Sequence, residues 1–131
     1  MGITRIDNVG VAVRDVNATA RFFKDRLGLN VELYVESEPP SAMVHVGDQY
    51  LYVFQTTNGA DGDRRSSELV DNPRGLDHVS FTVEDVDATY AELRDRGVQF
   101  EGEPATVQEW RMRMVAFRDP DGNSLFLVQS L

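Results

Sequence analysis

The sequence predicts an α+β fold of two tandem βαβββ modules, whose curved mixed sheets surround a cavity and carry their helices on the outer faces. The main observation is an internal repeat. Residues 7–26 align without a gap on residues 77–96, and nine of the twenty positions are identical. In each copy, an alternating apolar segment leads directly into a helical pattern, and further strand patterns follow.

The repeat also defines the expected domain organisation. We expect module one at 1–56, a linker at 57–75 and module two at 76–131. A module of this size would bury too little apolar surface to be stable alone. We therefore expect the 131 residues to form a single domain.

Each module begins with a strand and a helix. The apolar side chains of the two strands lie on one face, which the following helix can cover. They are Val9, Val11 and Val13 in module one, and Val79, Phe81 and Val83 in module two. Asp15 and Asp85 are suited to cap the helices, and Gly28 and Gly97 to end them.

Three strands are expected after each helix. In module one they are predicted at 30–35, 42–47 and 50–56, and in module two at 98–101, 111–118 and 124–129. Asp119-Pro120-Asp121-Gly122 separates the last two as a turn, because proline presets φ and glycine permits a positive φ. The linker is polar and rich in glycine, and we expect Arg64 and Arg65 in it to be solvated.

The composition limits the class of partner. The formal net charge is −9, and Lys24 is the only lysine. Such a surface is unfavourable for binding nucleic acid or an anionic membrane. There is no cysteine, no membrane-spanning apolar run and no apolar signal-peptide core near the N-terminus. We expect a cytoplasmic protein, with neither nucleic acid nor membrane as a partner.

The strand alternation selects candidate site residues. If the aliphatic residues face the helix, then Asn8, Tyr52, Phe54, His78 and Phe126 share the opposite faces of the two sheets. Two such sheets side by side would enclose a cavity. Trp110 lies near a strand of module two, beside Met112 and Met114. These side chains describe an aromatic pocket with a few polar anchors, and the alternative is that they simply fill the cavity.

The whole chain resembles the vicinal oxygen chelate superfamily, which includes glyoxalase I, extradiol dioxygenases and bleomycin-resistance proteins. The segments that carry the resemblance are IDNVGVAV (6–13), LGL (27–29), LDHVSFTV (76–83) and FRDPDGN (117–123). The resemblance implies paired βαβββ modules and a homodimer. It does not decide whether the modules pair within one chain or between two.

Enzymes of this superfamily bind a divalent metal through four positions, at the start of each module's first strand and in the middle of its last. The resemblance places those positions at Asn8, Tyr52, His78 and Phe126. Only His78 is a good ligand, because an amide is weak, a phenol must lose its proton and phenylalanine has no donor. We therefore expect no metal and no other cofactor, and a divalent metal is the alternative.

The sequence favours a metal-independent protein that binds a small hydrophobic or aromatic molecule, and catalytic residues stay unassigned. One alternative is a lyase, isomerase or dioxygenase with an atypical metal site, and another is a non-catalytic protein with a filled cavity.

His78 is either an anchor or general base in the pocket, or an inherited residue bonded to a neighbour. We expect His45 at the surface. We expect Arg111 and Arg113 to be solvated or at an interface, whereas inward-facing arginines would suit an anionic ligand.

The excess of acidic residues predicts dependence on salt, as in the cytoplasmic proteins of halophiles, and the alternative is an ordinary acidic protein. Molar salt shortens the Debye length to about 3 Å and screens the self-repulsion of the acidic surface. The thermal midpoint should therefore rise steeply as KCl is added. A midpoint that does not change with KCl would contradict the halophilic interpretation.

Overall fold

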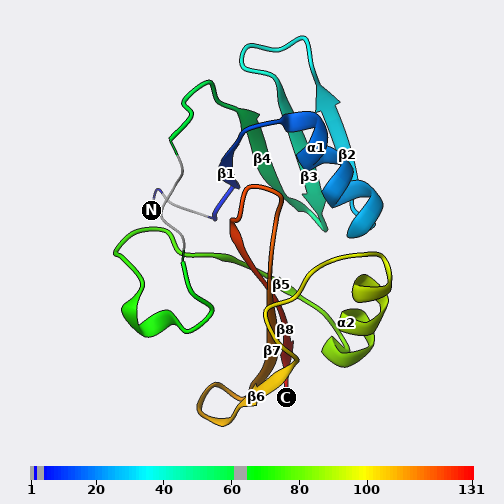
Figure 1. Cartoon of the computed structure of the whole chain (residues 1–131), viewed down its shortest axis with the longest axis vertical. Coiled ribbons are helices and arrows are strands. Elements are labelled where there is room, and N and C mark those ends of the chain that lie inside the picture. Colours follow the sequence, from blue (N-terminus) through cyan, green and yellow to red (C-terminus); the bar gives the residue numbers. More distant parts are fainter. Residues whose placement is uncertain (1, 3–4, 61–64) are drawn as a thin grey trace. The chain divides into compact units, whose positions relative to one another are not determined.

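The structure is a computed structural model that describes residue 2, residues 5–60 and residues 65–131, and it divides the chain into two compact units, Met1–Ala60 and Asp61–Leu131 (Figure 1). The first unit contains β1 (Asn8–Val13), α1 (Val16–Arg21), the π-helical turn η1 (Phe22–Arg26), β2 (Asn30–Tyr34), β3 (Ser41–Val46) and β4 (Gln49–Gln55). The second contains the 3-10 turn η2 (Leu69–Asp71), β5 (Val79–Thr82), α2 (Val86–Asp95), β6 (Ala105–Val107), the 3-10 turn η3 (Gln108–Trp110), β7 (Met112–Arg118) and β8 (Ser124–Ser130).

The two sheets have the same topology. Their strand orders are β1-β4-β3-β2 and β5-β8-β7-β6. In each sheet the first strand of the unit pairs in parallel with the last, and the other neighbours are antiparallel. A parallel pair needs a crossover connection, and here the helix begins that connection. The predicted α+β class and the βαβββ order are both confirmed.

Each helix covers one face of its own sheet. The first helix packs against β3 and β4, and α2 packs against β7 and β8 (Figure 1). The side chains that face α1 are buried, as at Val13, Val44 and Val53. In the second unit Val86 and Phe117 are completely buried. The opposite face of each sheet is called the free face below, and in β1 and β5 it carries the more exposed member of each alternating pair.

Both helices begin and end as predicted. The Asp15 carboxylate accepts hydrogen bonds from the first turn of α1, and Asp85 does the same for α2. Gly28 has a φ of 72° and Gly97 a φ of 92°, values that residues with a side chain rarely adopt. The predicted turn before β8 also forms, with Gly122 at a φ of 85°.

A second contact holds each helix to the last strand of its unit. The Val16 N–H donates to Gln55 Oε1 at 3.0 Å, and the Val86 N–H donates to Gln129 Oε1 at 2.8 Å. These amide groups lie at the helix start, where no intrahelical acceptor exists. Both copies of the repeat therefore have the same hydrogen bond from the first residue of the helix to a glutamine near the end of the last strand.

The strand predicted at 98–101 is wrong. Phe100 makes only an isolated bridge to Phe117, and the regular strand in this place is β6, which pairs with β7 from Ala105 opposite Met114. Between these two pairings, four residues (101–104) on one side lie opposite two (115–116) on the other. Gly102 has a φ of 92°, and Pro104 lacks an N–H, so the ladder is interrupted between the two pairings.

Arg113 is ion-paired with a residue of the helix, while part of its side chain stays exposed. Arg113 Nε and Nη2 donate to the two carboxylate oxygens of Asp87, at 2.7 and 2.8 Å. Asp87 lies in the first turn of α2, so Arg113 is on the helix side of β7 and joins the strand to the helix. Sequence alternation then leaves Met112 and Met114 on the free face.

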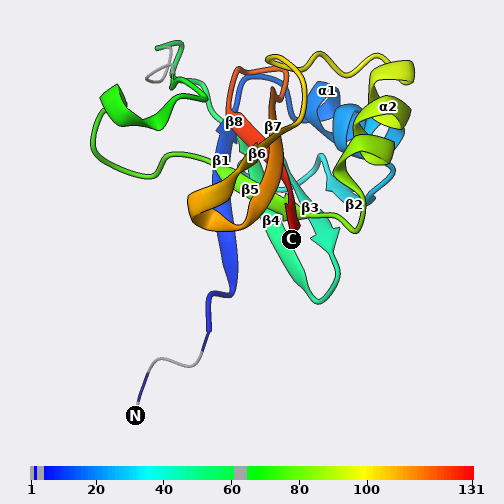
Figure 2. The ribbon, with the colours of Figure 1, turned by 90° about the horizontal axis from the view of Figure 1, so that it is seen from below.

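The segment that carries η2 loops out ahead of β5, on the side of this unit away from α2, as the two ribbon views agree (Figure 2). Its residues from 65 onward are tied to β5 by the hydrogen bonds described below. In the described parts of the chain, the helices are all too short or too polar to cross a membrane.

Replacing Gln129 by alanine should lower the free energy of unfolding by about 1–2 kcal/mol, because the buried Val86 N–H loses its acceptor. Urea denaturation would measure the change. Gln99→Ala is the matched control, since Gln99 is exposed. Equal midpoints for the two variants would show that this hydrogen bond contributes nothing.

Candidate functional site

The structure places the six predicted site residues in two separate sets, which are described separately. Asn8, Tyr52 and Phe54 belong to the sheet of the first unit, and His78, Trp110 and Phe126 belong to the second unit. The predicted alternation holds in β4, where Leu51 and Val53 are buried while Tyr52 and Phe54 are half-buried.

In the first unit, the Asn8 amide is held by its neighbours. Asn8 Nδ2 donates to Asp7 Oδ2 at 3.0 Å and to the Tyr50 hydroxyl at 3.3 Å. The Tyr50 hydroxyl in turn donates to Asp7 Oδ2 at 2.9 Å. The bonds from Asn8 and Tyr50 lower the pKa of the Asp7 carboxyl, and the same carboxylate raises the pKa of Tyr50. The Asn8 donors are therefore engaged in a local network.

Two aromatic rings lie beside this network. Tyr52 and Phe54 stack with their centroids 5.6 Å apart and their planes inclined by 23°. Across the parallel pair they face Gly10 and Ala12, whose small side chains project little over the free face. A flat apolar molecule could stack on the exposed part of these rings.

The same face carries a second polar group that the sequence analysis did not identify. His45 Nε2 lies 2.6 Å from Glu32 Oε1, and the Tyr34 hydroxyl donates to the other carboxylate oxygen of Glu32. The bonds from Tyr34 and His45 lower the pKa of Glu32. Alternation in 30–34 puts Glu32 and Tyr34 on one face, but the antiparallel register that brings them to His45 was not available from the sequence.

In the second unit, His78 stands immediately before β5. Its Nδ1 lies 2.7 Å from Asp77 Oδ2, and its ring packs against Phe126 with centroids 4.6 Å apart. Phe126 is only 3% exposed, whereas the His78 side chain is 26% exposed. Phe126 therefore acts as a packing support for the imidazole, and the imidazole is the accessible group.

Asp77 is held from the other side by the segment before β5. Asp77 Oδ1 accepts hydrogen bonds from Asn72 Nδ2 at 2.9 Å and from Arg65 Nη1 at 3.4 Å. The bond from His78, then those from Asn72 and the charge of Arg65, hold the pKa of Asp77 below its usual range against the effect of burial.

The expectation that Arg65 is solvated is therefore wrong. Its side chain is only 12% exposed, and it also donates to the Pro73 carbonyl. The physical reason is the half-buried carboxylate of Asp77. Burying its negative charge is unfavourable, and the positive charge of Arg65 offsets part of that cost. Arg64 lies outside the described residues.

Trp110 is not brought to His78. It lies in η3, at the tip of the β6–β7 hairpin, and is 52% exposed. The register pairs Met112 with Ser130, whereas His78 precedes the residue that pairs with Leu125. Five residues of strand separate those positions, a distance of about 17 Å.

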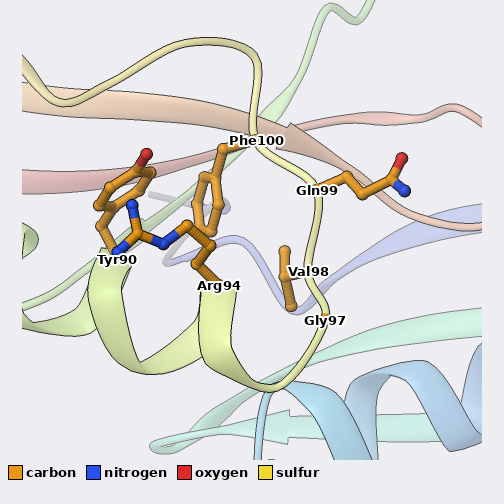
Figure 3. Close-up of a pocket in the computed structure, with 6 residues that line it drawn as sticks. All are labelled: Tyr90, Arg94, Gly97, Val98, Gln99 and Phe100. Atoms are coloured by element: carbon orange, nitrogen blue, oxygen red, sulfur yellow. The ribbon is translucent and has the colours of Figure 1, made fainter.

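A surface hollow of about 560 Å³ lies at the end of α2 (Figure 3). Tyr90 and Arg94 project from the helix, with the guanidinium 5.1 Å from the ring centroid, and Phe100 lies 4.8 Å from Tyr90. Gln99 points away from these rings in Figure 3. The hollow opens to solvent and is lined by none of the predicted site residues.

The four inherited ligand positions do not fit a divalent metal. His78 could offer Nε2 and Asn8 only a neutral carbonyl oxygen, Tyr52 would have to lose its phenol proton, and Phe126 has no donor atom. Within the described ranges, no three His, Asp or Glu side chains converge in the manner of a metal site. A catalytic metal usually needs about three protein ligands.

Comparison with known proteins identifies relatives along almost the whole chain. A family model described as the Glyoxalase/Bleomycin resistance protein/Dioxygenase superfamily matches residues 5–127. The uncharacterized protein YraH of Bacillus subtilis is 31% identical over 125 residues, which cover 94% of this chain and 96% of that protein. A Synechocystis protein named "probable lactoylglutathione lyase" is 27% identical over 124 residues, which cover 92% of this chain and 91% of the relative.

Solved structures give the same result for the fold. A glyoxalase family protein from Enterococcus faecalis superposes with a TM-score of 0.78 and 26% identity. The match covers 98% of this chain and all of that one.

The lowered pKa of Asp77 predicts a specific pH dependence. A carboxyl with a lower pKa when folded stabilises the protein above its unfolded pKa of about 3.9, and this contribution is lost as the pH falls. Urea unfolding of the wild type and of Asp77→Asn should therefore differ most near pH 6, and the difference should shrink towards about pH 3. A difference that stays constant with pH would contradict the prediction.

Proposed function

This chain belongs to the Glyoxalase/Bleomycin resistance protein/Dioxygenase superfamily, and on that basis we propose that it binds a small hydrophobic or aromatic molecule without a metal ion. The observation that carries the proposal is the set of residues at the four inherited ligand positions. Asn8, Tyr52, His78 and Phe126 include one good metal ligand, whereas a catalytic metal usually needs about three.

Of the four residues at the expected ligand positions, Phe126 argues most strongly against a metal. A buried phenyl ring excludes both a donor atom and the water that a metal site would hold in this position. The contact with Phe126 orients the His78 ring. His78 therefore stays a polar group of fixed orientation, although position 126 no longer supplies a metal ligand. This arrangement suits recognition of an organic molecule better than coordination of an ion.

The stacked rings of Tyr52 and Phe54 support the apolar part of the proposal. They are half-buried, stack with their planes inclined by 23° and face small residues across the strand pair. Ligand sites in proteins combine such apolar surfaces with a small number of polar groups. Within the first unit, Asn8 would be such a polar group. In the second unit, His78 would be the polar group beside the ring of Phe126.

The enzyme alternative is a metal-dependent lyase, isomerase or dioxygenase with an unusual ligand set. The Synechocystis relative named "probable lactoylglutathione lyase" favours a lyase. The residues described above argue against it, because three of the four positions lack a good donor. We further propose a homodimer, as the family resemblance implies, and a cytoplasmic location, as the composition suggests. A solution mass of two chains by light scattering would test the assembly.

Metal analysis combined with binding of 1-methoxynaphthalene tests the proposal. The purified protein should contain far less than one Mn, Fe, Ni or Zn per chain, and EDTA should not change the affinity measured by titration calorimetry. Tyr52→Ala should weaken binding about tenfold, because one face of the aromatic contact is lost. Tyr90→Ala is the matched control, a half-buried tyrosine of the other unit, and should bind as the wild type does.

One tightly bound metal per chain, with binding lost after EDTA treatment, would overturn the metal-free assignment. Absence of binding to any small aromatic molecule would instead favour a protein with a filled interior.

A further inference from the structure

We propose that the Asp77–His78 pair is a hydrogen-bond acceptor that selects ligands carrying a neutral hydroxyl, such as phenols and enols. The inference rests on the proposed function and names the chemical class of its ligand. It depends on which nitrogen of His78 carries the proton, and the contacts around Asp77 decide that.

Asp77 determines the tautomer of His78. An ionised carboxylate can only accept hydrogen bonds, so the 2.7 Å contact with Asp77 Oδ2 requires that Nδ1 carry the hydrogen. In the neutral imidazole, Nε2 is then an acceptor with its lone pair available. Within the described residues, the structure gives Nε2 no hydrogen-bond partner.

Asp77 is itself held in one orientation. Asn72 and Arg65 donate to Oδ1, which leaves Oδ2 for His78. Asn72 is fixed in turn, because its Nδ2 donates to the Ser66 carbonyl at 2.9 Å and its Oδ1 accepts from the Ser66 N–H at 2.8 Å. The segment before β5 therefore orients the carboxylate, and Asn72 and Arg65 are positioning residues.

The imidazole is fixed on its other side by the buried ring of Phe126, at 4.6 Å. Two fixed contacts leave His78 little freedom to reorient when a ligand binds. Such preorganisation reduces the entropic cost of forming one more hydrogen bond. With 26% of the side chain exposed, a small molecule can reach it.

The matching position of the first unit lacks this property. Asn8 also follows an aspartate, but there the side chain is an amide that donates to both Asp7 and Tyr50. Only its carbonyl oxygen is left, without a ring to orient it. Of the two matching positions, Asn8 and His78, only His78 therefore presents an imidazole nitrogen as an acceptor.

The chemistry of the acceptor limits the ligand. A carboxylate or phosphate brings only acceptor oxygens, which would face a lone pair and lie near the negative charge of Asp77. An ether or hydrocarbon would leave Nε2 without a partner. A hydroxyl group on an apolar ring satisfies the acceptor and belongs to the class of ligand named in the proposed function.

Two probes that differ in one donor test the inference. At about pH 8, where an ordinary imidazole is neutral, titration calorimetry should show that 1-naphthol binds about tenfold more tightly than 1-methoxynaphthalene. In Asp77→Asn the amide can donate to Nδ1, so that Nε2 carries the hydrogen and the preference should fall to within about twofold.

His78→Phe is the second variant, because it keeps a ring against Phe126 and removes the acceptor. It should also bind the two probes within about twofold of one another. Asp71→Asn, in the same segment and with the same change of charge, should keep the full preference.

The outcomes separate the two proposals. If the wild type binds both probes equally, the acceptor role is wrong and the proposed function stands. If the wild type binds neither probe, the proposed function is wrong, and the inference that rests on it is wrong too. A preference for 1-naphthol that survives in both Asp77→Asn and His78→Phe would overturn the assignment to this pair.

Discussion

The parallel pairing of the first and last strand of each unit is the constraint on which the rest of the structure depends. A parallel pair cannot be joined by a tight turn, so the chain must cross over one face of the sheet, and the helix buries that face. The opposite face is then left for other functions. The register of the pair decides which side chains meet there: Tyr50 stands beside Asn8, and the residue after His78 stands beside Leu125.

The two copies use this arrangement differently. In the first unit, an amide and two tyrosines form a polar and aromatic surface around Asp7 and Glu32. In the second, one histidine is held between a carboxylate and a buried phenyl ring. At the four positions that the family resemblance assigns to metal ligands, the chain carries an amide, a phenol, an imidazole and a phenyl ring. This is the physical basis for proposing recognition of an organic molecule in place of metal chemistry.

Features governed by residues close together in the chain could be predicted. The repeat, the alternation of Val9, Val11 and Val13, the caps at Asp15 and Asp85 and the turn at Gly122 all depend on local spacing and local conformational preference. The predicted strand at 98–101 failed because a ladder can be interrupted by residues such as Gly102, which carry no hydrophobic signal.

The sequence by itself determined the family, the two βαβββ modules and the side of each strand on which the site residues lie, because periodicity and turn chemistry are properties of neighbouring residues. Only the tertiary structure decided the partners of those residues. Arg65 beside Asp77, Arg113 on Asp87 and His45 on Glu32 each join segments that are distant in the chain. Such contacts depend on register and crossover geometry, and no local pattern of residue types encodes them.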